Sequence, residues 1–294
     1  MKTFKNIVVA TDFSDASRIA YHYAHRLASR FQASLKVVHA YQVFVNPSRP
    51  ELNEYTPSIA ELQTLNEQRM SDFIHETEEV LGSDTIVVSH VPVTTEVKMG
   101  FTPDVLIEIS KDPSVDLLVL GTSGEKKWFD RLLGSVAVEV SQSAQCPVLL
   151  VPQKADFQGI HNILYAASDD SAKPKTVRIA VDWAKYFMAC LHFVHINVEP
   201  KDELTEPMRF FFRNYINEYA PDLPHDVASV TSKSVMAGIW NYAHKHNMDL
   251  VVVVSHHRGF WESFNHHSVS KDLSLHTRLP ILYLYSDVKN HPPN

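Results

Sequence analysis

Residues 116–152 read DLLVLGTSGEKKWFDRLLGSVAVEVSQSAQCPVLLVP. The stretch holds one short apolar run at 117–120 and a second at 148–151, with three glycines followed by Ser135 between them. Short apolar runs bounded by glycine or proline are typical of the buried strands of a parallel sheet. We therefore predict two such strands, joined by a glycine loop and a helix that begins at Ser135.

The rest of the first half extends this unit into an α/β sheet. Three further apolar runs predict strands, at 7–10, 35–39 and 86–91. Between the first two runs, apolar residues recur at helical spacing from Ala16 to Phe31, and Ser14 precedes them as the expected N-cap. Strands that alternate with helices predict a parallel sheet of βαβ units.

Two more helices are predicted between these strands. Residues 58–81 form a longer charged pattern, and a shorter helix is expected to end near Ser110. At the start of the shorter helix, Thr102, Pro103 and Asp104 predict an N-cap, a first-turn proline and an acid that complements the helix dipole.

The second half repeats the order of the first. Its apolar runs predict strands at 163–167, 191–197, 227–230, 250–254 and 281–284. Local matches, such as IVVATDFS with ILYAASDDS, support the repeat, and residues 116–147 align without a gap to 249–280 at an offset of 133. We therefore expect two domains, at 1–153 and 160–287, each an open parallel five-stranded sheet flanked by helices.

The composition limits the function classes. A net charge of −7 without a cluster of Lys and Arg argues against nucleic-acid binding, and no apolar stretch approaches the length of a membrane span. The four apolar residues before Thr11 are too few for a signal peptide. The only two cysteines, Cys146 and Cys190, form neither a disulfide framework nor a CxxC pair. We expect a cytoplasmic protein.

The glycine loop has the chemistry of a phosphate site. The chain has only eight glycines, and three of them lie between positions 121 and 134. Because glycine lacks a Cβ, its amide can approach an anion, and the first amides of a helix at Ser135 would add the positive end of the helix dipole. Open α/β sheets bind ligands at the carboxyl ends of their strands. An ordinary strand-to-helix turn is the alternative interpretation of the same glycines.

Several motifs resemble the universal stress protein family in its tandem two-domain form: ATDFS at 10–14, VVHA at 37–40, GTSG at 121–124, GSV at 134–136 and CPVLLVP at 146–152. The resemblance implies a Rossmann-like, adenine-nucleotide alpha-hydrolase-like fold and a regulatory or stress-response module that binds ATP, with or without Mg. It also implies a nucleotide site formed by Ala10, Thr11, Asp12, Ala40, Leu120, Gly121, Gly124, Gly134, Ser135 and Val136. For Asp12, capping of the helix beside Ser14 is the alternative role.

Catalysis is expected to be slow at most. Efficient ATP hydrolysis needs a positioned base or water-orienting group and usually a metal held by carboxylates. The sequence lacks the P-loop pattern GxxxxGK[ST]. The leading hypothesis is therefore a module whose ATP-bound and empty states differ in affinity for an unidentified partner.

The second half departs from the nucleotide pattern. At the offset of 133, the three glycines align with Val254, His257 and His267, so side chains stand where amides would approach a phosphate. We expect this half to have lost the ATP site. A group of imidazoles replaces it: His256, His257, His266 and His267. Three interpretations stay open, namely a polar loop with exposed histidines, a zinc site that would make the chain a metal carrier, and an anion site.

Further expectations concern packing. His39 and His195, at matching ends of two predicted strands, are expected to be core histidines with satisfied hydrogen bonds. The aromatic segment 208–215 predicts either core packing with an interface or the hydrophobic pocket of a ligand carrier. The closing strands 148–151 and 281–284 would be apolar edges, which aggregate unless they are paired. We predict that they meet at the centre of an internal pseudo-dimer, with further homo-oligomerisation left open.

Overall fold

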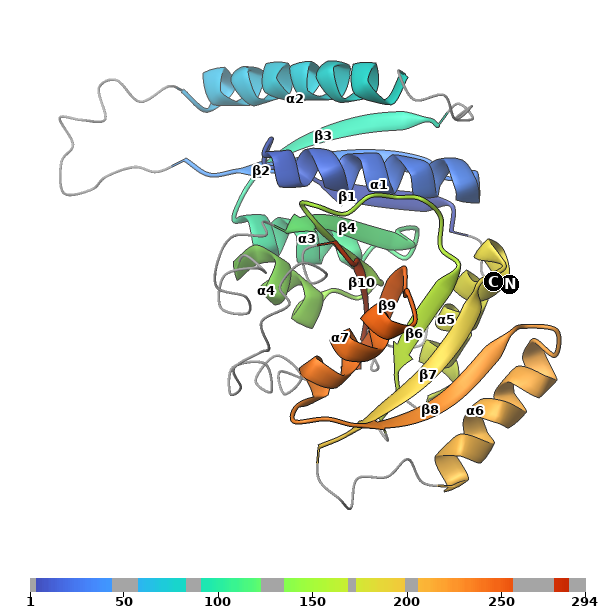
Figure 1. Ribbon diagram of the computed structural model, residues 1–294. Helices are drawn as coiled ribbons and strands as arrows, with labels where there is room; N and C mark the ends of the chain where they lie inside the picture. The colour runs from blue at the N-terminus through green and yellow to red at the C-terminus, as the bar shows by residue number, and fades with distance from the viewer. Residues whose placement is uncertain are drawn as a thin grey trace, which may run out of the picture.

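A computed structural model of the chain describes residues 4–43, 58–82, 91–122, 135–168, 173–198, 206–255 and 278–285. The ten described strands form one sheet in the order β3-β2-β1-β4-β5-β10-β9-β6-β7-β8 (Figure 1). The first half supplies β1 (Asn6–Ala10), β2 (Ser34–Tyr41), β3 (Val93–Met99), β4 (Leu117–Thr122) and β5 (Val148–Pro152). The second half supplies β6 (Asn162–Ala166), β7 (Cys190–Asn197), β8 (His225–Thr231), β9 (Leu250–Ser255) and β10 (Ile281–Tyr285).

The two halves meet edge to edge in the middle of this sheet. Within each half the described pairings are parallel, whereas β5 and β10 pair antiparallel, with Leu149 opposite Leu282 and Val148 opposite Tyr283. Taken from the outer edge inward, β3-β2-β1-β4-β5 and β8-β7-β6-β9-β10 are the same order. The predicted pair of parallel sheets, joined through their closing strands, is therefore confirmed, and the pairing covers two apolar edges.

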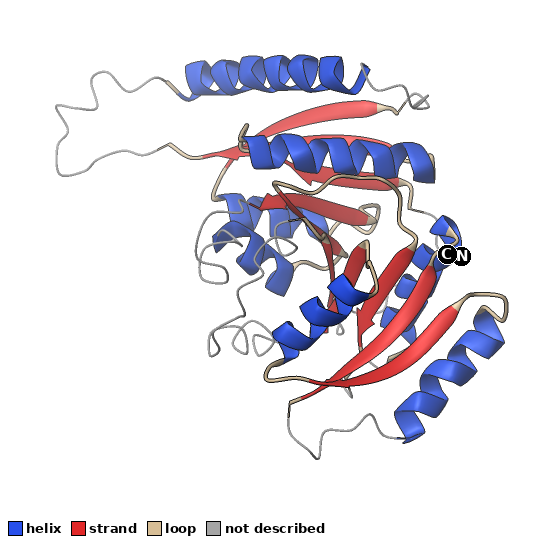
Figure 2. Cartoon of the chain, viewed as in Figure 1, coloured by secondary structure: helices blue, strands red, loops and turns tan. Residues whose placement is uncertain are grey.

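Helices cover both faces of the sheet (Figure 2): α1 (Asp15–Phe31), α2 (Ile59–Gly82), α3 (Thr102–Ser110), α4 (Ser135–Ser143), α5 (Pro174–Phe187), α6 (Glu206–Tyr219) and α7 (Val235–Lys245). One core lies under α1, α2, α5 and α6, and the other lies under α3, α4 and α7. Successive side chains of a strand alternate between them, so that Val119 of β4 faces the first core and Leu120 faces the second. Within the described ranges, no helix combines the length and apolar character that crossing a membrane requires.

The third strand lies further along the chain than predicted. The structure has β3 at Val93–Met99, whereas the apolar run suggested 86–91, of which 86–90 lie outside the described residues. As the outermost strand, β3 exposes Thr94 and Thr95 and therefore lacks the continuous apolar run that marks a strand buried on both faces.

The N-cap of α3 also differs from the prediction. Phe101 occupies the cap position with extended backbone and makes no side-chain cap bond, while Thr102 is already helical. Pro103 is tolerated at any first-turn position, because the N–H groups there have no intrahelical partner. The proline therefore indicates the first turn without fixing the residue at which the helix starts.

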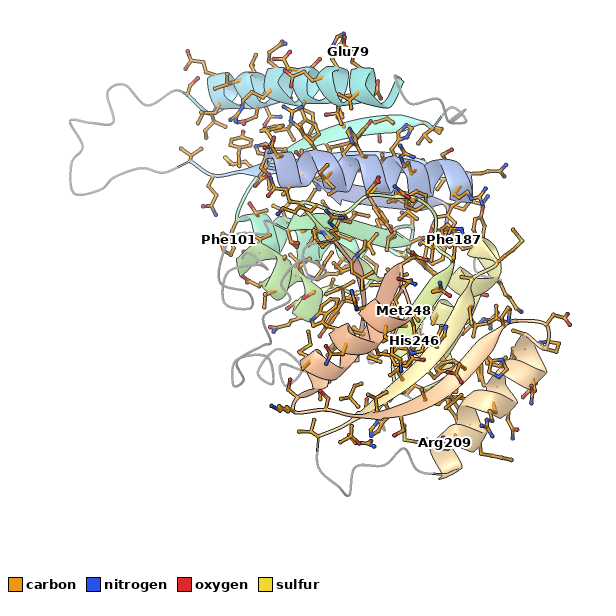
Figure 3. The ribbon with its side chains drawn as sticks, in the orientation of Figure 1. Glu79, Phe101, Phe187, Arg209, His246 and Met248 are labelled. Atoms are coloured by element: carbon orange, nitrogen blue, oxygen red, sulfur yellow. The ribbon has the colours of Figure 1, made fainter. Side chains whose placement is uncertain are left out.

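An aromatic cluster joins the halves on the face covered by α1 and α5. Trp183 of α5 is fully buried, and its ring centroid lies 5.6 Å from those of both Phe4 and Phe31. Phe187, labelled in Figure 3 where α5 meets the first half, lies 5.5 Å from Phe31. Each such ring buries about 150–250 Å². The halves are thus held together by face packing as well as by the β5–β10 edge.

The internal repeat extends to hydrogen bonds at the amino edge of the sheet. Asp116 Oδ2 accepts hydrogen bonds from the amides of Lys5 and Asn6, at 2.8 and 3.2 Å. The aligned Asp249 accepts the same pair of bonds from the amides of His161 and Asn162, at the start of β6, at 2.7 and 2.9 Å. The sequence repeat is therefore a repeat of specific contacts as well as of elements.

The aromatic segment 208–215 lies in α6. Phe212 is fully buried and Phe210 is 67% exposed. The aromatics of this segment divide between the first core and the surface, as consecutive side chains on a helix must, and core packing accounts for the buried ones.

Candidate functional site

Those predicted nucleotide residues that the structure describes lie at the carboxyl edge of the first half's strands, around β1. This strand lies between β2 and β4, with Ala10 opposite Val38. From β1 the chain extends the sheet outward through β2 and β3 and then returns to β4 on the other side. Such a switch point is where doubly wound sheets bind ligands. Ala10 and Ala40 are half-buried, and Leu120 is buried.

Hydrogen bonds hold the turn from β1 into α1. The Thr11 amide donates to the Val38 carbonyl at 2.9 Å, and Thr11 Oγ1 shares a hydrogen bond with Ser17 Oγ at 2.9 Å. Asp12 Oδ1 accepts from the amide and the hydroxyl of Ser14, at 3.0 and 2.5 Å. Ser14 Oγ accepts in turn from the Ser17 amide at 3.3 Å, which confirms Ser14 as the N-cap of α1. Asp12 supports this cap and is still exposed at the edge.

These bonds favour the ionised form of Asp12. Partial desolvation raises the pKa of its carboxyl, but the hydrogen bonds from Ser14 and Ser17 outweigh that effect and leave the pKa below its ordinary value. An exposed carboxylate next to small side chains can accept hydrogen bonds from the hydroxyl groups of a ligand.

Gly121 lies at the end of β4, where α1 passes close to the sheet. A Cβ on Gly121 would lie 2.5 Å from the carbonyl oxygen of Ala16 and 2.9 Å from the amide nitrogen of Ser17. Helix packing therefore requires this glycine. From the sequence, this glycine indicates either amide access for an anion or an ordinary turn, because the approach of α1 depends on tertiary structure.

The second half builds the corresponding edge with larger side chains. Ile196 takes the position in β7 that Ala40 has in β2, and it packs so closely on α7 that a Cβ on Gly238 would lie 2.4 Å from Ile196 Cγ2. Val254 takes the position of Gly121 and is buried. Whereas α1 packs on β4 and β5, the main sheet contacts of α5 are with β6 and β7. Compared with α1, α5 therefore lies nearer the outer strands of its half.

The remaining predicted residues are described in part. Ser135 begins α4, and Val136 in its first turn is half-buried. Gly124 and Gly134 lie outside the described residues. The same is true of the candidate zinc ligands His256, His257, His266 and His267. Among the residues that the structure does describe, no three His, Cys, Asp or Glu side chains are grouped as metal ligands.

Three side chains beside Asp12 were not predicted as site residues. Phe13 has a left-handed backbone, with φ 66°, and its ring centroid lies 4.2 Å from that of His39 and 4.7 Å from the Arg69 guanidinium carbon. His39 Nδ1 lies 2.8 Å from the Thr11 carbonyl oxygen, as expected for a core histidine with a satisfied hydrogen bond. The only sequence signal for this cluster is the recurrence of VVHA as FVHI.

The surroundings of His39 favour its neutral form. Burial lowers the pKa of the imidazole, and the nearby Arg69 lowers it further. Hydrogen bonds to Thr11 and Asn66 and the charge of Asp12 raise the pKa, but the sum of these effects leaves it below its ordinary value.

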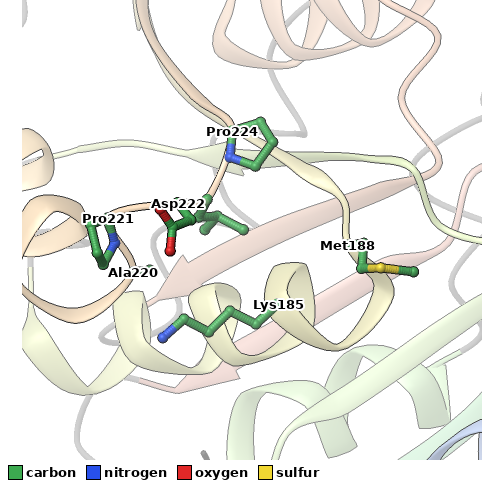
Figure 4. Close-up of a pocket in the computed structure, with 7 residues that line it drawn as sticks. Lys185, Met188, Ala220, Pro221, Asp222 and Pro224 are labelled. Carbon is green, nitrogen blue, oxygen red and sulfur yellow. The ribbon is translucent and has the colours of Figure 1, made fainter.

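A groove of about 330 Å³ lies in the second half, at the amino edge of the sheet (Figure 4). It runs between the end of α5 and the connection from α6 to β8, and its lining residues are Lys185, Met188, Ala220, Pro221, Asp222, Leu223 and Pro224. Its one ammonium group, on Lys185, already donates a hydrogen bond to the Tyr219 carbonyl. The groove is separate from the candidate nucleotide edge.

Comparison with known proteins supports the resemblance found in the motifs. A universal stress protein of Methanocaldococcus jannaschii is 30% identical over 148 residues, which cover 50% of this chain and 82% of that protein. One of Synechocystis is 24% identical over 217 residues, 67% of this chain and 72% of its own. The crystal structure of a universal stress protein from Archaeoglobus fulgidus covers 96% of this chain and 98% of its own, with 16% identity and a TM-score of 0.66, which is a likeness of fold. The model of the universal stress protein family matches residues 3–152, half of the chain, and the chain therefore belongs to that family.

Proposed function

We propose that the first half binds one ATP at the carboxyl edge of β1, β2 and β4, and that the chain acts as a nucleotide-binding module in a stress response or in regulation. The observation that carries this proposal is the meeting of three features at one switch point. They are the exposed carboxylate of Asp12, the short side chains of Ala10 and Ala40, and the amino end of α4 at Ser135.

The adenine and ribose would lie over β1 and β2. Ala10 and Ala40 are half-buried on neighbouring strands, and their short side chains offer a flat apolar contact. Ligand pockets combine such apolar walls with a few placed polar groups. The ionised carboxylate of Asp12 would accept hydrogen bonds from the ribose hydroxyls.

The phosphates would lie over the glycine loop and the start of α4. The first amides of a helix have no intrahelical partner, and the positive end of the helix dipole favours an anion. In this proposal, Ser135 and Val136 contribute amides from α4, while Gly124 and Gly134 allow the loop backbone to approach the phosphates.

We further propose that the second half has no ATP site. Ile196 takes the place of Ala40, and His257 and His267 align with the loop glycines Gly124 and Gly134. One nucleotide per chain is the consequence. The role we propose is binding rather than rapid turnover, because the Nδ1 atom of His39 and the Oδ1 atom of Asp12 are both engaged in holding the turn.

The proposal is tested by calorimetry of the nucleotide-free full chain with ATP and two variants. Asp12→Asn removes the carboxylate, and since a charged hydrogen bond contributes about 1.5–3 kcal/mol, we expect ATP to bind about ten- to a hundredfold more weakly. Asp169→Asn, which changes the first carboxylate after β6 in the second half, is the control and should leave the affinity unchanged. No binding to the wild-type chain, or equal weakening by both variants, would contradict the proposal.

A further inference from the structure

His39 bonds to the peptide group that leads into Asp12. It is the sixth residue of β2, is only 8% exposed, and places Nδ1 2.8 Å from the Thr11 carbonyl oxygen. A carbonyl oxygen only accepts hydrogen bonds, so Nδ1 carries the proton and is the donor. Because the Thr11 amide donates to the Val38 carbonyl, β2 holds Thr11 through both its N–H and its C=O.

The imidazole also supports the other side of the turn. The residue after Asp12 is Phe13, whose left-handed φ of 66° is unfavourable for a side chain with a Cβ and needs support from its surroundings. The Phe13 ring packs against His39, with 4.2 Å between centroids, and lies under the Arg69 guanidinium. His39 therefore contacts the turn immediately before Asp12 and immediately after it.

The second half repeats the histidine–carbonyl hydrogen bond of the first half. His195 is the sixth residue of β7, and its Nδ1 lies 2.9 Å from the Ala167 carbonyl oxygen. The Ala167 amide donates to the Val194 carbonyl at 2.8 Å, as the Thr11 amide does to Val38. The two histidines thus make equivalent bonds, but Ile196 follows His195 where the smaller Ala40 follows His39.

We propose that His39 is a positioning residue for nucleotide binding: it fixes the Thr11 carbonyl and the Phe13 ring, and so holds the Asp12 carboxylate at the edge where the ligand sits. The inference rests on the proposed ATP site. It goes beyond that site because His39 acts through the turn, and its contribution depends on an N–H at the Nδ1 position.

Three variants of His39 separate positioning from general stability. His39→Leu removes the donor and keeps an apolar side chain in the core. His39→Asn restores an N–H on the atom bonded to Cγ, where Nδ1 stands, whereas His39→Gln carries its amide one bond further out. We expect ATP affinity, measured by calorimetry on the full chain, to fall about tenfold or more in the Leu and Gln variants and to recover in the Asn variant.

His195→Leu is the matched control. It removes the equivalent bond from the second half, so it should lower stability in urea as His39→Leu does, and yet leave ATP affinity unchanged. Folded Leu and Gln variants of His39 that bind like the wild type would overturn the inference, and so would weakening by His195→Leu to the same degree. If His39→Leu fails to fold, the comparison of ATP affinity between His39→Asn and His39→Gln tests the inference. A wild-type chain that does not bind ATP would contradict the proposed function as well. A wild-type chain that binds ATP, with His39 variants that bind equally well, would contradict only the role of His39.

Discussion

At the scale of single residues, Gly121 is needed for the packing of α1 on β4, which its position in a glycine loop does not indicate. Because a Cβ there would lie 2.5 Å from the Ala16 carbonyl oxygen, α1 or β4 must shift when any side chain is added. We expect Gly121→Ala to reduce the free energy of unfolding by about 1–3 kcal/mol, as overpacking does. Urea unfolding measures this. A Gly121→Ala variant as stable as the wild type would show that α1 does not pack too closely on β4 for a Cβ at this position.

We expect His39 to make the stability of the chain depend on pH, with a sign that follows from its lowered pKa. Burial lowers its folded-state pKa below the ordinary 6.5, so the unfolded chain binds the proton more tightly. Its contribution to stability is present above pH 6.5 and is lost as the pH falls from there toward the folded-state pKa. Urea unfolding at about pH 7.5 and about pH 5.5 should show a smaller loss in His39→Asn than in the wild type. An equal loss would assign the dependence to other groups.

At the scale of elements, α1 connects the candidate site to the junction between the halves. Its amino end carries the cap made by Ser14 and Asp12, and its carboxyl end carries Phe31, which packs on Trp183 of α5. A change at the cap is therefore expected to affect both the stability of the helix and the geometry of the site.

The cap can be tested against an equivalent cap elsewhere in the fold. Ser14 accepts from the Ser17 amide, and Ser234 caps α7 in the same way by accepting from the Ala237 amide. We expect Ser14→Ala and Ser234→Ala each to cost about 0.5–2 kcal/mol of stability. Only Ser14→Ala should also weaken ATP binding, because Ser14 donates to Asp12. If calorimetry finds the same ATP affinity for both variants, the Ser14 cap does not contribute to the nucleotide site.

Most elements could be predicted from the sequence, because their apolar residues follow the period of a buried strand or a one-sided helix. The position of the edge strand β3 was predicted wrongly, since Thr94 and Thr95 face solvent and break the apolar run. Of the site, the turn at Thr11 and Asp12 was found through motifs. The contacts of Phe13 with His39 and Arg69 were not, because Arg69 comes from α2, distant in the sequence, and only folding brings it to the turn.

At the scale of the whole molecule, one ten-stranded sheet and an aromatic cluster make each half depend on the other. Residues 1–153 expressed alone would expose the β5 edge and the surface of Phe31 that covers Trp183. We expect this fragment to self-associate or aggregate, as unpaired apolar edges do, and light scattering after size-exclusion chromatography measures it. A stable monomeric fragment would contradict the interdependence of the halves.

The central claim is that one half binds ATP and the other does not, and native mass spectrometry of the full chain tests it most directly. With ATP added in excess to nucleotide-free protein, the account predicts a mass increase of one nucleotide per chain. Gly134→His, which copies the aligned His267 of the second half, should abolish this increase while the circular dichroism spectrum stays unchanged. No bound nucleotide, or two per chain, would contradict the account.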